Sequence, residues 1–308
     1  MMDWTDRHCR YFLRQVSRRA RLYTEMITTG ALIHGDVERH LAFSPAEHPL
    51  ALQLGGSEPD ELAQCAKLGE DYGYDEINLN IGCPSERVQK GAFGACLMAE
   101  PQLVAACVAA IKSAVSVPVT VKHRIGVNDI QDYSFVRNFV AIVAEAGCRT
   151  FIVHARNAVL KGLSPKENRV IPPLKYDYVY RLKDDFPDLE IVINGGINAW
   201  VEITNHLAYV DGVMLGRAAY HNPWLLADPG KTRAGVVREM YDYAKAVDSL
   251  RHVTRHMLGL YHGHKKARLW RRMLSDSERL KHNRAELLLE ALELVEAPGY
   301  SAFVPAAA

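Results

Sequence analysis

The sequence lacks the features that mark membrane-spanning and disulfide-stapled proteins. Its 308 residues contain no apolar run close to the roughly 20 residues that span a bilayer. The N-terminus, MMDWTDRHCRYFLRQ, has no basic-then-apolar signal segment. The six cysteines show no CxxC or Cys/His spacing typical of a metal site. We therefore expect reduced thiols, no bound metal, no membrane partner and a cytoplasmic location.

Net charge is also nearly absent. The chain has 37 Lys and Arg against 36 Asp and Glu. A nucleic acid would therefore have to be bound by a local basic patch rather than by overall attraction. The length exceeds the usual size of a single hydrophobic core, so both one large barrel and two domains are compatible with it.

Short apolar runs rich in β-branched residues alternate with helical patterns through the first two-thirds of the chain. The runs are residues 22–28, 50–56, 76–83, 117–124, 150–156, 190–196 and 211–217. The helical patterns are residues 6–17, 59–73, 103–115 and 133–147. This alternation predicts βαβ units and a parallel sheet whose strands are buried on both faces.

Eight such units suit a TIM (β/α)8 barrel. Because the chain opens with a helical pattern before the first apolar run, we expect the first barrel strand to be truncated. An open doubly wound sheet is the alternative, but no GxGxxG follows an early strand, which weakens it.

The pattern changes near residue 228. The segment ADPGKTRAG, residues 227–235, is typical of a linker, and the patterns that follow are helical: 236–250, a long stretch at 251–273, and 282–296. We expect two domains, a barrel at 1–227 and an all-α domain at 228–308, which ends in a small apolar tail at 301–308.

Polar residues stand at the ends of the predicted strands, where the sites of TIM barrels lie. They are Gln53, Asn78, Asn80, Cys83, Lys122, His123, Arg124, His154, Arg156, Asn194 and Arg217. Any one of these side chains could instead form its hydrogen bonds with the backbone of a nearby loop. The repetition of this pattern at several strand ends favours a binding site.

Two of these strand ends are similar to phosphate-binding loops. Asn194-Gly195-Gly196 follows one strand, and Gly216-Arg217 follows the next. Glycine lets backbone N–H groups approach an anion, and arginine adds a fixed charge. The last strands of many barrels hold such a site, so we expect a phosphorylated cofactor here, with a pair of tight turns as the alternative.

Lys122 and His154 end two successive predicted strands and could face an electron-rich ring. A buried lysine needs an anionic partner. A reduced flavin supplies one at N1, next to a carbonyl that accepts a hydrogen bond. A structural ion pair is the alternative.

Residues 251–272 form a basic region without an acidic residue. Exposed faces normally mix charges of both signs. Unmixed positive charge, interleaved here with four histidines and Trp270, predicts contact with a phosphate backbone. Its basic residues are Arg251, Arg255, Lys265, Lys266, Arg268, Arg271 and Arg272. The KENR run, residues 166–169, would extend that surface.

The stretch LNIGCPSERVQKGAFGACLM, residues 79–98, closely resembles the signature of the tRNA-dihydrouridine synthases, and MMDWTDRHCRYFLR and LYTEMI look like the A subfamily. The likeness includes LALQLGG, VKHRIG, HARNAVLKGLSPKENR, INGGI and LGRAAYHNPW, and more weakly ARLWRRML. The resemblance implies an FMN-dependent barrel with a helical tRNA-binding domain. Such an enzyme would use NADPH to reduce uridine to 5,6-dihydrouridine in the tRNA D-loop, at about position 20 or 20a. We expect it to be a monomer.

The resemblance also implies roles for individual residues. The flavin would be held by Met1, Met2, Gln53, Lys122, His154, Asn194, Gly195, Gly196, Gly216 and Arg217. Asn80 would contact the target uridine, and Cys83 would donate a proton. The tRNA would be oriented by Arg156, Lys166, Arg169, Arg268, Arg271 and Arg272.

The chemistry agrees with these roles. Flavin N5 would deliver hydride to C6 of the uracil, and C5 would take a proton from the opposite face. An ordinary cysteine thiol, with a pKa of about 8.5, is mostly protonated at neutral pH and can act as a general acid. The base must also leave its stack to reach the flavin.

Two other functions are compatible with parts of this pattern. One is an FMN barrel that acts on a free pyrimidine, similar to dihydroorotate or dihydropyrimidine dehydrogenases, which would not need the basic region. The other is a non-catalytic RNA-binding barrel without a flavin.

Overall fold

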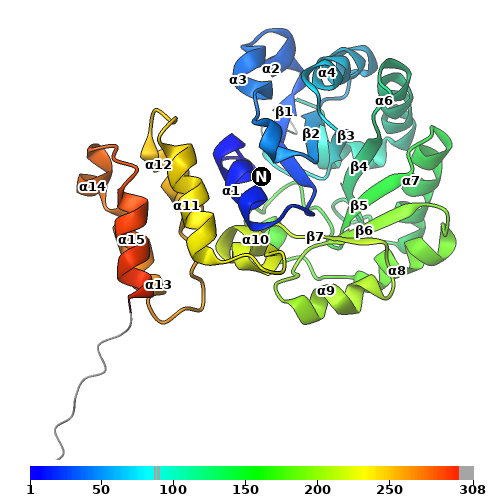
Figure 1. Ribbon diagram of the computed structural model, residues 1–308. Helices are drawn as coiled ribbons and strands as arrows, with labels where there is room; N and C mark the ends of the chain where they lie inside the picture. Colours follow the sequence, from blue (N-terminus) through cyan, green and yellow to red (C-terminus); the bar gives the residue numbers. More distant parts are fainter. Residues whose placement is uncertain (87, 89–90, 298–308) are drawn as a thin grey trace, which may run out of the picture.

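The computed structural model describes residues 1–86, 88 and 91–297. Seven parallel strands form one curled sheet (Figure 1). They are β1 (Leu22–Thr28), β2 (Leu50–Gly55), β3 (Glu76–Ile81), β4 (Val119–Arg124), β5 (Thr150–His154), β6 (Glu190–Asn194) and β7 (Gly212–Met214). The strands pair in the order of the sequence, from β1 to β7. This order confirms the predicted TIM-like sheet and excludes the doubly wound alternative, in which the strand order reverses.

The seven strands coincide with the seven apolar runs. All six residues of β2 are buried, as expected for strands covered on both faces. Among the described residues, β1 and β7 do not pair with each other, so the curled sheet is open between them.

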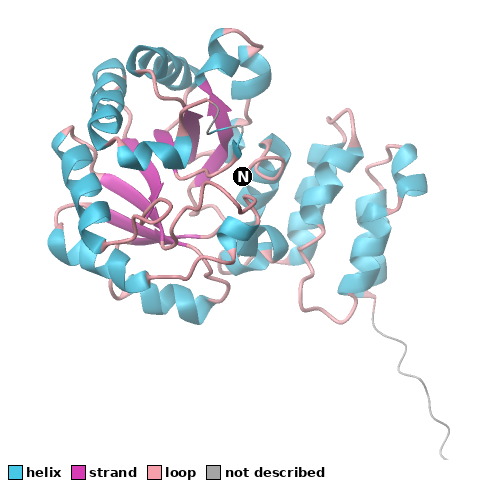
Figure 2. Cartoon of the chain, turned by 180° about the vertical axis from the view of Figure 1, so that it is seen from behind, coloured by secondary structure: helices cyan, strands magenta, loops and turns pink. Residues whose placement is uncertain are grey.

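Helices surround the outside of the sheet (Figure 2). They are α2 (Thr29–Ile33), α3 (Val37–Leu41), α4 (Pro59–Tyr72), α6 (Pro101–Ala114), α7 (Tyr133–Glu145), α8 (Tyr176–Asp185), α9 (Trp200–Leu207) and α10 (Arg217–His221). Their apolar faces pack on the strands. On α7, for example, Val136, Phe139, Val140 and Val143 are buried. This spacing is the helical periodicity that predicted α4, α6 and α7, whereas α2, α3, α8, α9 and α10 were not predicted.

Polar side chains form a continuous chain of hydrogen bonds within the sheet. Asn80 Nδ2 donates to Gln53 Oε1 and Gln53 Nε2 to Asn78 Oδ1, each over 2.8 Å. Asn78 Nδ2 then donates to Thr120 Oγ1 over 2.8 Å, and Thr120 Oγ1 to Glu76 Oε1 over 2.6 Å. Each bond offsets part of the cost of burying these groups.

A helical region follows the sheet, and it is the leftmost part of Figure 1. It contains α11 (Arg233–Ala244), α12 (Leu250–Met257), α13 (Ala267–Ser275), α14 (Ser277–Lys281) and α15 (Leu287–Glu296). The predicted continuous stretch at 251–273 is therefore wrong, because the chain turns between α12 and α13. At Gly259 a Cβ would lie 2.5 Å from the carbonyl oxygen of His221, so only glycine fits this close approach. The predicted tail at 301–308 lies outside the described residues.

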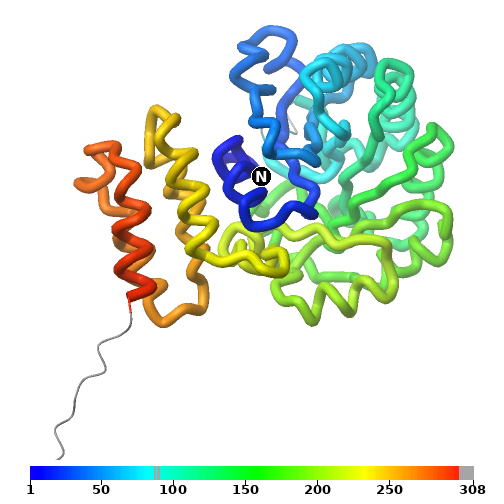
Figure 3. Tube along the Cα trace, in the orientation of Figure 1, coloured from blue at the N-terminus to red at the C-terminus, as the bar shows by residue number. Residues whose placement is uncertain are grey.

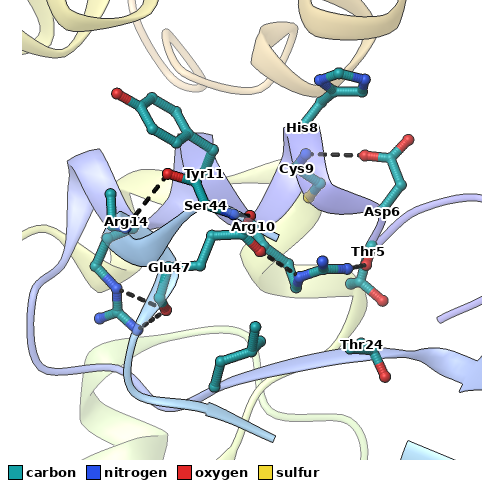
Figure 4. A network of polar contacts seen from close by, with 12 residues as sticks. Thr5, Asp6, His8, Cys9, Arg10, Tyr11, Arg14, Thr24, Ser44 and Glu47 are labelled. Carbon is teal, nitrogen blue, oxygen red and sulfur yellow. Dashed lines mark hydrogen bonds and ion pairs between the residues drawn. The ribbon is translucent and has the colours of Figure 1, made fainter. Parts of the chain in front are cut away.

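The helix α1 (Arg7–Val16) connects the two parts of the chain, as the trace in Figure 3 shows. It packs on α11 and α12 and also on β1. On the sheet side, Arg10 Nε lies 2.6 Å from Glu47 Oε2, and both side chains are buried. Arg14 donates to the carbonyl oxygen of Glu47 (Figure 4). No helix in the described part of the chain is long and apolar enough to cross a membrane.

Candidate active site

A cavity of about 780 Å³ lies inside the curled sheet. It brings together twelve of the residues predicted to bind cofactor or substrate: Met1, Gln53, Asn80, Lys122, His154, Arg156, Arg169, Asn194, Gly195, Gly196, Gly216 and Arg217. These residues come from segments far apart in the sequence. The parallel sheet gathers them because the carboxyl ends of its strands meet at one edge.

Other predicted residues lie elsewhere. Met2 is 58% exposed and does not line the cavity, because the turn in which Trp4 N and Thr5 N donate to Met1 O directs only Met1 inward. Lys166 is exposed in the loop after β5. The three arginines of α13 are exposed in the helical region: Arg268, Arg271 and Arg272.

Two polar residues near the strand ends are buried away from the mouth of the cavity. His123 is completely buried, with its ring 5.0 Å from that of Phe139 on α7. Adjacent residues of a strand point to opposite faces, so His123 lies outside the sheet while Lys122 lies inside it. Asn78 is enclosed in the hydrogen-bond chain within the sheet.

Lys122 projects into the cavity from β4. Its Nζ donates to Asn194 Oδ1 over 3.2 Å, and Asn194 Nδ2 in turn donates to the carbonyl oxygen of Met214 over 2.8 Å. Burial, and after it the charge of Arg124, lowers the pKa of Lys122 to about 8. An acceptor or an anion bound beside Nζ would stabilise the ammonium form.

His154 ends the neighbouring strand, β5. Burial, and after it the charge of Arg124, holds the pKa of His154 well below its usual range, so the ring is neutral. Among the described residues its Nδ1 has no hydrogen-bond partner. A buried ring nitrogen without a partner is costly, and a ligand in the cavity could satisfy it.

Gly195 allows the chain to pass close to His154. Its φ is +114°, and a Cβ at this position would lie 2.9 Å from Cδ2 of His154. Tyr176 fixes the same turn, since its hydroxyl donates to the carbonyl oxygen of Gly195 over 2.7 Å. Sequence reasoning missed Tyr176, which has no distinguishing pattern around it.

Three arginines gather at the loops after β5 and β7. Arg217 Nη2 donates to the carbonyl oxygen of Arg169 over 3.0 Å, and Arg156 Nη1 donates to that of Val170 over 3.1 Å. Within residues 1–86, 88 and 91–297, none of the three has a carboxylate partner, and Nε of Arg156 and of Arg169 is buried without an acceptor. Burial lowers the pKa of both, and the charge of Arg217 lowers it further. Such a cluster fits an anionic group such as a phosphate.

The turn after β3 presents Cys83. Asn80 Oδ1 accepts hydrogen bonds from the backbone N–H groups of Gly82 and Cys83, each over 3.0 Å. The carbonyl oxygen of Cys83 accepts from Ala95 N over 3.0 Å. Gly82 lines the cavity, whereas the half-buried Cys83 stands next to it and donates to Ser85 Oγ over 3.5 Å. The turn is thus held on both sides of the thiol.

The cavity also extends to the amino ends of the strands, which sequence reasoning had not examined. Arg21, Tyr23, Glu76, Thr150 and Glu190 line it there. Arg21 pairs with the buried carboxylate of Glu76, which also accepts from the hydroxyl of Tyr23 over 3.2 Å. Thr150 Oγ1 likewise donates to Glu190 Oε2 over 2.7 Å, so the polar groups at this end form hydrogen bonds with one another.

The residues present fit a phosphorylated ring cofactor. The cavity provides an ammonium group and an imidazole from neighbouring strands, a glycine turn, and an arginine cluster without carboxylates. In the described part of the chain no group of three or more His, Cys, Asp or Glu side chains could hold a metal ion.

Comparisons with known proteins identify the family of this chain. The family model described as dihydrouridine synthase (Dus) matches residues 1–296. The tRNA-dihydrouridine(20/20a) synthase of Synechocystis sp. is 55% identical, over 97% of this chain and 94% of its own length. The proteins of the same name from Vibrio parahaemolyticus and Pseudomonas putida are each 56% identical, over 95% and 96% of this chain and 94% and 92% of their own lengths. This chain therefore belongs to the dihydrouridine synthase family.

Proposed function

We propose that this chain is a flavin-dependent enzyme that reduces uridine to 5,6-dihydrouridine in tRNA, at position 20 or 20a as the names of its relatives state for them. The observation that supports this most is one cavity that holds Lys122, His154 and the arginine cluster beside the turn of Cys83. The free-pyrimidine alternative leaves the exposed arginines of α13 without a role, and the RNA-binding alternative does not require a ring cofactor site.

FMN fits the cavity by its chemistry. The glycine turn at Gly195 and the loop of Gly216 and Arg217 would hold the phosphate, since backbone N–H groups and a guanidinium suit a dianion. Lys122 and Gln53 would donate to the ring, and His154 would bind beside it. When bound, the flavin supplies the hydride, and NADPH is the proposed reductant.

Cys83 is proposed to be the general acid. Reduction of the C5–C6 bond places a hydride on C6 and requires a proton on C5. Because Asn80 and Ala95 fix the backbone of Cys83, the thiol is held at a defined point next to the cavity. A positioned acid of this kind contributes about 10² to 10⁴-fold.

The tRNA would be bound by residues 228–308, with residues 1–227 as the catalytic part. Arg268, Arg271 and Arg272 are exposed on α13, and Lys166 is exposed in the loop after β5. Trp270 does not belong to this surface. It is fully buried and donates to the carbonyl oxygen of Met257 over 2.8 Å, so within the predicted basic region only the charged side chains are available to a phosphate backbone. The cytoplasmic location and the monomeric state stay predictions.

The proposal is tested by position-resolved mapping of dihydrouridine. The full chain, loaded with FMN, is incubated with NADPH and unmodified tRNA transcripts, and with free uridine and uracil in parallel. We expect dihydrouridine at position 20 or 20a of tRNA only. Turnover of free pyrimidine at equal efficiency would favour the alternative enzyme, and a chain that binds tRNA without FMN would favour the non-catalytic barrel.

A further inference from the structure

The first six residues form an arm that reaches from the cavity to the helical region. At one end, Met1 and Thr5 line the cavity, and Met1 Sδ would lie 3.6 Å from a Cβ built on Gly216. At the other end, Asp6 caps α1 by accepting from Cys9 N over 2.9 Å (Figure 4). Any displacement of this arm therefore changes one wall of the proposed flavin site.

Two residues of α12 hold the arm. Nε2 of His256 lies 2.9 Å from Asp6 Oδ1, and the side chain of His256 is fully buried. Arg255 Nη2 donates to the carbonyl oxygen of Asp3 and lies 3.4 Å from Asp6 Oδ2. Both contacts join residues about 250 positions apart in the sequence.

An aromatic stack completes the attachment. Trp4 stacks on Tyr220, with ring centroids 4.4 Å apart and planes 23° from parallel. The hydroxyl of Tyr220 lies 3.2 Å from Nδ1 of the same His256 that binds Asp6. His256 thus contacts the arm directly through Asp6 and indirectly through Tyr220 and Trp4.

Asp6 is ionised under ordinary conditions. Burial alone would raise the pKa of its carboxyl, but the hydrogen bond and charge of His256, together with the hydrogen bond from Cys9 N and the charge of His8, outweigh burial and lower that pKa to about 2. A partly buried carboxylate that loses its partners is destabilised, so the clamp by His256 and Arg255 favours one position of the arm.

On the sheet side the arm is held independently. Arg10 Nη1 donates to the carbonyl oxygen of Thr5 over 2.8 Å, while its Nε pairs with Glu47 (Figure 4). Loss of the α12 contacts would therefore loosen Asp3 and Asp6, while the stack of Trp4 on Tyr220 remains and α1 stays anchored.

We propose that Arg255 and His256 are positioning residues that fix the arm through Asp3 and Asp6, so that the helical region shapes the cofactor cavity as well as binding tRNA. This inference rests on the proposed function for its flavin readout. A purely structural role in capping α1 would leave the cavity unaffected.

The test compares Arg255→Met and Asp6→Asn with Arg255→Lys and with Arg251→Met. Asn at position 6 keeps an acceptor for Cys9 N, and Lys at 255 can still donate to Asp3. Arg251 is exposed on the same helix and serves as the matched control. Circular dichroism checks that each full-length variant is folded.

Hydrogen–deuterium exchange of residues 2–6, measured without flavin, is the first readout. FMN affinity and the visible spectrum of bound FMN are the second. We expect Arg255→Met and Asp6→Asn to raise exchange in the arm about tenfold and to weaken FMN binding about tenfold, the effect of losing one charge-assisted hydrogen bond. Arg255→Lys should show a smaller change in exchange and in FMN affinity than Arg255→Met. Arg251→Met should have the exchange rate and FMN affinity of the wild type.

Unchanged exchange in both variants would overturn the inference. Faster exchange with wild-type FMN affinity and spectrum would overturn it as well, since the arm would then not shape the cavity. If the wild-type chain binds no FMN, the proposed function fails, and exchange alone decides whether α12 holds the arm.

Discussion

The amide side chain of Asn80 joins Gln53 to the turn of Cys83. Its Nδ2 donates to Gln53 Oε1 over 2.8 Å, and its Oδ1 accepts from the backbone N–H groups of Gly82 and Cys83 over 3.0 Å. Both ends of the amide are therefore occupied. The family resemblance implies that Asn80 contacts the uridine. The geometry adds that Asn80 holds the turn that carries Cys83.

We expect Asn80→Ala to lower kcat for dihydrouridine formation about tenfold to a hundredfold, because the turn of Cys83 loses its acceptor. Asn80→Asp keeps that acceptor and should retain more activity. The rate at which iodoacetamide alkylates Cys83, measured by mass spectrometry, should change in Asn80→Ala. Equal losses in both variants, with unchanged alkylation, would argue against a role in holding the turn.

The proton-donor role predicts that Cys83→Ala binds FMN and accepts electrons from NADPH but forms dihydrouridine about 10² to 10⁴-fold more slowly. Cys96→Ala is the matched control. Cys96 is also half-buried, and its Sγ donates to the carbonyl oxygen of Phe93 over 3.1 Å. Single-turnover oxidation of the reduced enzyme by tRNA measures the step. Normal turnover in Cys83→Ala would show that Cys83 is not the proton donor.

The lowered pKa of Lys122, about 8 in place of 10.5, predicts a pH dependence of flavin binding. Below pH 8 the ammonium group is present and can donate to the flavin, so affinity should be constant. Above pH 8 the free protein loses this proton, and affinity should fall by up to about tenfold per pH unit. Fluorescence titration with FMN between pH 6 and 10 measures it.

The lowered pKa of Lys122 also makes the stability of the folded protein depend on pH, in the opposite direction to flavin affinity. Between about pH 8 and 10.5 the unfolded chain keeps a proton on Lys122 that the folded, flavin-free protein releases. Stability of the flavin-free protein should therefore rise with pH across that window. Lys122→Met should remove both the pH dependence of FMN affinity and the rise of stability with pH. If either pH dependence persists in this variant, another titratable group causes it.

The arginines of α13 predict salt-dependent tRNA binding. Replacing Arg268, Arg271 and Arg272 by Ala should weaken binding and reduce the slope of log K against log salt by about two to three, if each neutralises a phosphate. Flavin binding should stay unchanged. The control replaces Arg18 and Arg19, which are exposed before the amino end of β1. A slope equal to that of the wild type would show that α13 does not contact the backbone.

Much of the fold could be predicted because its signals are local. Apolar runs of seven or eight residues separated by helical periodicity identified all seven strands, and the glycines near residues 195 and 216 marked two of the loops that line the cavity. The resemblance in residues 79–98 identified the family to which the chain belongs.

The three-dimensional structure decided what depends on orientation and on distant partners. Alternation along β4 separates Lys122 from His123, but only the curvature of the sheet determines which one faces the cavity. Trp270 has the sequence context of a nucleic-acid contact, yet the helices around it bury its ring. Asp6 and His256 meet because α1 packs on α12. Local sequence determines secondary structure, whereas burial and long-range pairing depend on how the elements pack.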